Sequence, residues 1–144
     1  MPRKNHARVV LALLFSLMGF TYASAQEKAK TLFTGTFHGK VHPTSGRATV
    51  YQETDGRQML RLTNFKTSNG PDVHVVLIAA KDADDDANFL KNSTERIELG
   101  GLKGNEGDQN YDIPKGTDLH RFQTVSIYCV RFNANFGAAP LEKF

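Results

Sequence analysis

The residue best suited to covalent chemistry in this chain is its single cysteine, Cys129. It lies in residues 125–132, a stretch dense in β-branched and aromatic side chains that predicts a strand. With a period of two, Cys129 shares one strand face with Val125, Ile127 and Arg131. The other face is also mostly apolar and carries Ser126, Tyr128, Val130 and Phe132. Apolar side chains on both faces are typical of a strand inside a sheet rather than at its edge.

Two interpretations of Cys129 are open. Free cysteine is among the most buried residue types, and its apolar neighbours favour an inert core thiol. Alternatively, the permanent positive charge of Arg131 would favour the thiolate if both side chains lay near the rim of the sheet. One thiol cannot carry out dithiol–disulfide exchange by itself. It would need a partner protein's cysteine, oxidation to sulfenic acid, or a metal or haem iron to ligate. This second interpretation predicts that Cys129 reacts with a thiol reagent in the native protein.

Metal chemistry has little support in the sequence. The acidic stretch 82–88 resembles the start of a calcium loop, but Ala87 and Ser93 stand where glycine and a bidentate glutamate are required. The histidines outside the first 25 residues, at positions 38, 42, 74 and 120, have no zinc-site spacing. We interpret His74 as a hydrogen-bonded core or rim residue. The sequence thus predicts neither metal ligands nor cofactor-binding residues, and the identity of any cofactor stays unknown.

The glycine-rich stretch 101–107 lacks the ending of a phosphate-binding loop and precedes no helix pattern. Its glycines favour a structured loop, which Leu102 and Tyr111 could pin at one end of the molecule to form a rim for a ligand. No nucleophile elbow of the Gly-x-Ser-x-Gly type is present, and whether the protein is an enzyme is left open.

The elements that must position these residues are all predicted to be strands. Asp55 and Gly56 between two apolar runs predict a hairpin with a tight primed turn. Residues 73–78 predict a buried central strand, with further strands at 31–38 and 97–99 and a long last strand at 119–132. Turn residues recur about every ten positions, which is typical of a single-domain, all-β, antiparallel β-sandwich or barrel with short helical turns at most.

Residues 1–25 predict a signal peptide for export. Arg3, Lys4 and Arg8 precede a short apolar run, and Ala23, Ser24 and Ala25 form a small-residue cleavage site. The run is too short for a membrane-spanning helix, and the rest of the chain has no longer one. We therefore expect a soluble periplasmic or extracellular protein with a flexible segment at 26–30 and one domain at 31–144.

Charge argues against nucleic acid as a partner. The chain has 18 basic and 15 acidic residues, but three of the basic ones lie in the predicted signal peptide. The remaining chain is electrically balanced, whereas nucleic-acid binding relies on an excess of positive charge.

Five motifs in order along the chain resemble the DM-13 domain, the electron-transfer domain of Skeletor-type proteins. They are Leu62-x-Asn64-Phe65, Gly70-Pro71-Asp72-Val73-His74-Val75, Leu99-Gly100-Gly101-Leu102-Lys103-Gly104-Asn105, Gly107-Asp108-Gln109-Asn110-Tyr111-x-Ile113-Pro114, and Val125-x-Ile127-Tyr128-Cys129-x-x-Phe132 with Phe136-Gly137-x-Ala139-x-Leu141. Tyr128 stands where the family more often has tryptophan. The resemblance implies a β-rich extracytoplasmic module whose single cysteine, here Cys129, takes part in redox chemistry.

The sequence thus predicts an exported accessory redox or electron-transfer module that acts through Cys129, with a redox partner protein. The alternative is a non-catalytic envelope or extracellular binding module, in which the cysteine is structural and loops 70–72 and 101–107 recognise a glycan, lipid or protein. A third possibility is a structural envelope protein that docks through a sheet edge.

Overall fold

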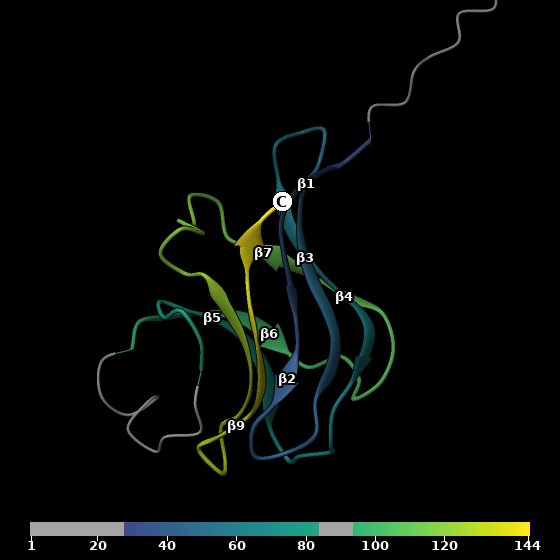
Figure 1. Cartoon of the computed structure of the whole chain (residues 1–144), viewed down its shortest axis with the longest axis vertical. Helices are drawn as coiled ribbons and strands as arrows, with labels where there is room; N and C mark the ends of the chain where they lie inside the picture. The colour runs from purple at the N-terminus through teal and green to yellow at the C-terminus, as the bar shows by residue number, and fades with distance from the viewer. Residues whose placement is uncertain (1–27, 84–93) are drawn as a thin grey trace, which may run out of the picture.

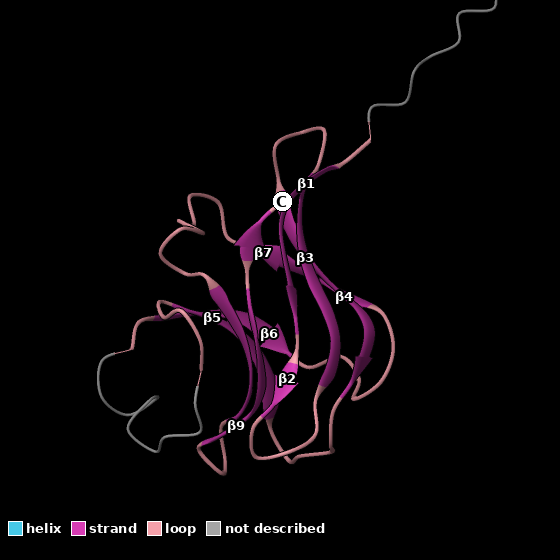
Figure 2. Ribbon diagram, in the orientation of Figure 1, coloured by secondary structure: helices cyan, strands magenta, loops and turns pink. Residues whose placement is uncertain are grey.

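A computed structural model describes residues 28–83 and 94–144. These residues form strands and no helix, so no membrane-crossing helix exists in the part of the chain described (Figure 2). The ten strands are β1 Lys30–Thr36, β2 His38–Gly39, β3 Ser45–Gln52, β4 Gln58–Lys66, β5 Val73–Ile78, β6 Arg96–Gly101, β7 Gln109–Ile113, β8 Thr124–Cys129, β9 Ala134–Pro140 and β10 Glu142–Lys143.

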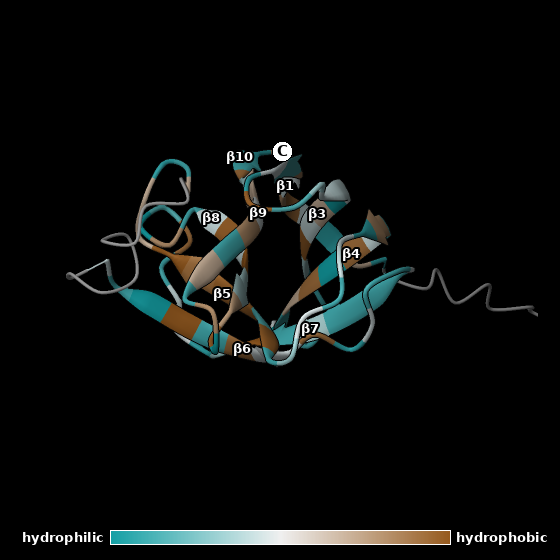
Figure 3. Cartoon of the chain, turned by 90° about the horizontal axis from the view of Figure 1, so that it is seen from below, coloured by the Kyte–Doolittle hydropathy of each residue, from teal (hydrophilic) through white to brown (hydrophobic). Residues whose placement is uncertain are grey.

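The strands form two antiparallel sheets that face each other (Figures 1 and 3). The first sheet has the order β10-β1-β3-β4-β7 and the second has the order β2-β9-β8-β5-β6. The predicted all-β, antiparallel β-sandwich is confirmed, and the sheets do not close into one barrel.

The main core lies between the two sheets and follows the two-residue period of the strands. Leu60 and Leu62 of β4 point into it from the first sheet. Val75 and Leu77 of β5 meet them from the second sheet, and all four side chains are fully buried. Burial of these alternating side chains supplies the main driving force for joining the sheets.

The second sheet is also buried on its outer face, beneath residues 79–83. Val76, Ile78, Tyr128 and Ala138 form a smaller apolar cluster there with Ala83. Two hydrogen bonds anchor the covering segment. Thr124 Oγ1 donates to the carbonyl of Ala80 at 2.7 Å, and Asn135 Nδ2 donates to that of Ala83 at 3.3 Å. This double burial confirms residues 73–78 as a buried strand and explains why they read as a continuous apolar run.

The predicted hairpin between β3 and β4 is confirmed, but the prediction of a tight primed turn is wrong. A primed two-residue turn centred on Asp55 and Gly56 needs positive φ at Asp55, and type I′ needs it at Gly56 as well. Only Gly56 has it, with φ of 87°. The loop instead closes through hydrogen bonds from the Gly56 N–H to the Glu53 carbonyl at 2.9 Å and from the Glu53 N–H to the Arg57 carbonyl at 2.8 Å. These bonds describe a three-residue loop that ends in a glycine bulge.

The predicted last strand at 119–132 is wrong in extent. Residues 119–122 form a turn in which the Phe122 N–H donates to the Asp118 carbonyl at 2.8 Å. β8 begins at Thr124 and ends at Cys129, and the chain then reverses through residues 130–133. Asn133 takes a φ of 49° there, which an extended strand does not allow, and β9 returns antiparallel to β8.

Candidate functional site

Cys129 lies at the end of β8, and its exposed fraction is 0%. In the sheet register it is paired with Val73 of β5 and Ala134 of β9. Its side chain belongs to the main core, together with Val125 and Ile127 of its own strand. In this conformation the sulfur therefore has no contact with solvent.

Arg131 does not share a strand face with Cys129, as the sequence pattern had predicted, because β8 ends first. It is exposed in the turn of residues 130–133. The turn is held by the Val130 N–H, which donates to the Asp72 carbonyl at 2.9 Å. The Tyr128 hydroxyl also donates to Asn133 Oδ1 at 2.6 Å. A few hydrogen bonds at a surface turn thus close the core next to the thiol.

His74 forms a clamp with two carboxylates beside this turn, on the outer face of β5. Its Nδ1 lies 2.5 Å from Glu98 Oε1 and its Nε2 lies 2.7 Å from Asp72 Oδ1. The pKa of His74 is raised, chiefly because of its hydrogen bond to Glu98. Partial burial lowers this pKa, and the hydrogen bond to Asp72 raises it further. The Asp72 carboxylate thus binds His74 while its carbonyl binds Val130, so the clamp fixes the loop against which the turn rests.

The clamp predicts a pH-dependent stability for His74→Gln. Because the folded pKa is raised, the clamp stabilises the fold fully below the ordinary value of 6.5 and loses this contribution as the pH rises through the folded pKa. We expect His74→Gln to cost about 1 kcal/mol near pH 5.5 and less at alkaline pH, measured by urea unfolding across the pH range. Glu98→Gln should flatten the same pH dependence, whereas a pH-independent loss in His74→Gln would contradict the clamp.

Gln109 and Tyr111 of β7 hold the glycine-rich loop. The Tyr111 hydroxyl accepts the Lys103 N–H at 2.9 Å and donates to Gln109 Oε1 at 2.6 Å. Gln109 Nε2 donates to the Gly104 carbonyl at 2.9 Å, and Leu102 packs against the core. Burial raises the pKa of Tyr111. The expectation that Leu102 and Tyr111 pin this loop is confirmed.

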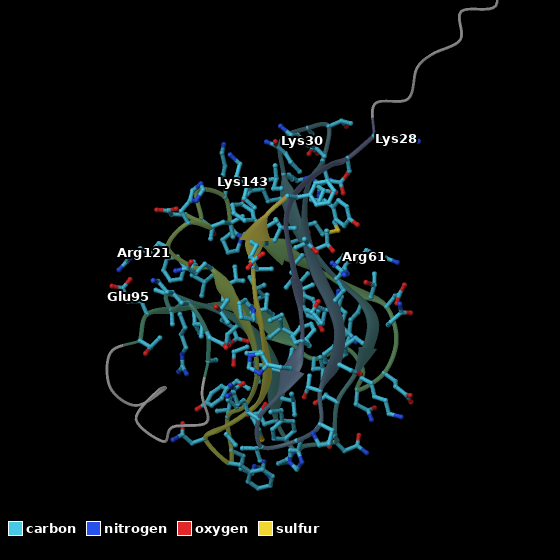
Figure 4. The ribbon with its side chains drawn as sticks, viewed as in Figure 1. Lys28, Lys30, Arg61, Glu95, Arg121 and Lys143 are labelled. Atoms are coloured by element: carbon cyan, nitrogen blue, oxygen red, sulfur yellow. The ribbon has the colours of Figure 1, made fainter. Side chains whose placement is uncertain are left out.

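Asp108 joins two of the motifs that are separate in the sequence. Its Oδ1 accepts the N–H of Asn64 at 2.9 Å, where the backbone takes a φ of 49°. Its Oδ2 accepts Arg61 Nη2 at 3.1 Å, and Arg61 is labelled on β4 in Figure 4. Because the carboxylate holds the Asn64 N–H, it stabilises a left-handed backbone conformation that few residues other than glycine adopt.

The loops before β5 and after β6 border one cavity of about 380 Å³. Its walls combine polar groups with three apolar side chains, and its lining residues are Ser68, Asn69, Gly70, Pro71, Asp72, Val73, Leu102, Gly104 and Asn105. Val73 both borders the cavity and faces Cys129 in the sheet register.

We call the turn 130–133 and the loops at 40–44, 67–72 and 102–108 the cysteine end. Backbone hydrogen bonds from Val130 to Asp72 and from Thr67 to Asn105 join three of them.

A larger cavity, of about 660 Å³, lies at the opposite end. The β3–β4 hairpin and residues 112–117 line it, and its charged groups include the exposed Arg57–Asp55 ion pair. It contains none of the residues that the sequence motifs brought to the cysteine end. Its size alone does not make it the functional site.

Residues 28–83 and 94–144 contain no group of three side chains that could hold a metal ion. The four histidines lie apart, since His38 binds Asp82 at 2.7 Å, His42 packs edge-on against Phe136, and His120 packs against Phe33. Of the calcium-like acidic stretch, the part from residue 84 onward lies outside the described residues.

Comparison with known proteins gives one match. A family model described as "Electron transfer DM13" matches residues 36–141, which includes every motif from Leu62 to Leu141. The chain belongs to the DM13 family. Searches among curated proteins and among solved structures found no match. As a DM13 domain, the protein is of the electron-transfer class.

Sequence reasoning missed the clamp of this DM13 domain. Asp72 two residues before His74 was a usable signal, because residues at that spacing point to the same side of an extended chain. Glu98 carried no signal, since its place beside His74 depends on the β5–β6 pairing, which shifts register between Val75 and Val76.

Proposed function

We propose that this DM13 domain is an exported electron-transfer module whose redox group is the Cys129 thiol and whose reaction partner is another protein. The observation that carries the proposal is the family match over residues 36–141, in a chain with one cysteine. The residues that suggest export, 1–25, lie outside the described part of the chain.

The chemistry that suits a single thiol is exchange with a disulfide of the partner. The Cys129 thiolate attacks one partner sulfur, the partner's disulfide bond breaks, and a new disulfide joins the two proteins. The other partner sulfur leaves as a thiolate, so electrons balance without a further oxidant. A thiol from another molecule then attacks the partner's sulfur in the mixed disulfide, and Cys129 leaves as the thiolate.

Access to the buried sulfur requires local opening at the cysteine end. Cys129 is the neighbour of Val130, whose N–H bond to Asp72 is one of the few bonds that hold the turn. Opening the turn and loop 67–72 would separate these bonds while most strand pairs remain intact. Such local openings cost less free energy than global unfolding.

Cys129→Ala is the variant that tests this proposal. Alanine suits the apolar core better than serine, whose hydroxyl would be buried without an assured hydrogen-bond partner. We expect wild type to form a mixed disulfide with glutathione disulfide in native buffer, detected by intact mass, and Cys129→Ala to form none. Stability should fall by only about 1 kcal/mol, so loss of the adduct would not reflect unfolding.

Burial of Cys129 favours a second candidate function, a binding module in which the thiol is structural. The loops at 70–72 and 101–107 that the sequence singled out belong to one end, and both contribute residues to the 380 Å³ cavity. Under this alternative a glycan, lipid or protein binds there, and Cys129→Ala keeps full function. An adduct that forms only in denaturant would favour this alternative over the redox proposal.

A further inference from the structure

Exposed apolar side chains gather at the cysteine end. Four large hydrophobic residues are exposed in the described chain, and three of them, Val41, Val130 and Phe132, lie in loops at this end. Their exposed fractions are 42%, 45% and 62%. The fourth, Phe144, lies at the opposite end.

The two loops that carry these residues are neighbours. The loop after β2 runs beside the start of β9, where the Val41 N–H donates to the Asn135 carbonyl at 3.2 Å. The 130–133 turn leads directly into β9. Figure 1 shows both loops at the lower end of the molecule. We call Val41, Val130, Arg131 and Phe132 the apolar tip.

The apolar tip itself carries one positive charge, on Arg131, and no negative charge. Arg131 stands between the two exposed side chains of the turn. Residues 37–52 and 119–141 contain no aspartate or glutamate. The Asp72 carboxylate beside the turn is hydrogen-bonded to His74, with 2.7 Å between the two atoms. A partner of the tip should therefore be apolar and anionic.

An apolar and anionic partner could be a protein or a lipid surface, and the small area of the apolar tip favours the lipid surface. One phenylalanine and two valines can bury roughly 300 Å² between them. A stable protein interface buries about 800 Å² on each side. Side chains on loop tips can instead enter the boundary between lipid headgroups and acyl chains, while neighbouring cations bind anionic headgroups. We propose that the apolar tip binds reversibly to the surface of an anionic lipid bilayer.

In this arrangement Phe132 and the two valines enter the interfacial layer. Arg131 lies at the headgroup level, where its aliphatic stem can extend along apolar surface and its guanidinium can bind phosphate. Binding uses surface residues and not the thiol. Cys129→Ala should therefore bind vesicles as wild type does.

Vesicle sedimentation tests the proposal with two compositions, phosphatidylcholine alone and the same lipid with about one third phosphatidylglycerol. We expect wild type to bind the anionic vesicles and to bind them less in high salt. Phe132→Ser should lower the affinity about ten-fold. Arg131→Gln should lower it about five-fold. Both positions are exposed, so thermal unfolding should show that the variants remain folded.

Phe144→Ser is the matched control, since Phe144 is exposed at the opposite end, where Figure 4 labels Lys30 and Lys143. It should leave vesicle affinity unchanged. Absence of binding by wild type would overturn the proposal. Binding that survives Phe132→Ser, or that Phe144→Ser removes, would also overturn it. So would a lipid-free dimer that Phe132→Ser dissociates, seen by analytical ultracentrifugation, because it would make a second copy the occupant.

Discussion

Cys129 in the folded protein is expected to react with a maleimide at least about a thousand-fold more slowly than in the unfolded chain at the same pH. The reason is its exposed fraction of 0%, which makes each reaction wait for an opening of the structure. The unfolded reference is measured in denaturant, so that the ratio of the two rates reports the opening equilibrium.

The same measurement distinguishes a reactive thiol from a structural one. If opening is local, the native rate should depend only weakly on added urea, because little surface is exposed. Asp72→Asn, which weakens the bond to His74, should raise the rate about five-fold. Asp112→Asn, the control, removes an exposed carboxylate from β7 and should leave the labelling rate unchanged. A rate that follows global unfolding in every variant would remove the basis for the Cys129 redox proposal.

Gly35→Ala is expected to destabilise the fold by about 3 kcal/mol or more. An added Cβ at Gly35 of β1 would lie 2.1 Å from the Pro140 carbonyl oxygen and 2.9 Å from its carbon. Both atoms belong to the backbone of β9, in the other sheet, so no side-chain rotation can relieve the clash. The change would force apart the edges where the two sheets approach each other.

Gly101→Ala in β6 is the control for this prediction. No atom lies within 4 Å of its added Cβ, and its φ is not in the positive range. Urea unfolding should show a change within about 0.5 kcal/mol for this variant. Equal losses in the two variants would mean that the close approach of β1 to β9 does not limit stability.

The two-sided burial of the second sheet links the fold to the candidate site. Ser126 and Tyr128 of β8 lie on its outer face, with Ser126 Oγ donating to Asn135 Oδ1 at 2.9 Å. Cys129 and its inward neighbours fill the other face. Because neither face of β8 meets solvent, the thiol can become accessible only at the strand's end, where the turn begins.

Local patterns in the sequence were enough to predict the fold class. The hairpin around Asp55 and Gly56 and the buried run at 73–78 follow from turn chemistry and hydrophobic periodicity, which depend on neighbouring residues alone. The family motifs added the electron-transfer class. By contrast, β9 was missed because Gly137, Ala138 and Ala139 have low strand propensity, and their burial against β8 outweighs it.

The arrangement of the site depended on contacts between distant parts of the chain. Glu98 reaches His74 across 24 positions, and Asp108 reaches Asn64 across 44. Such pairs are set by strand order and register, which a one-dimensional pattern does not contain. The sequence alone determined that this is an all-β chain with one thiol in an apolar stretch. Only the tertiary structure decided that β8 ends at that thiol, that the clamp lies beside it, and that Val130 and Phe132 face solvent, because chain reversal and burial depend on what the rest of the chain packs against.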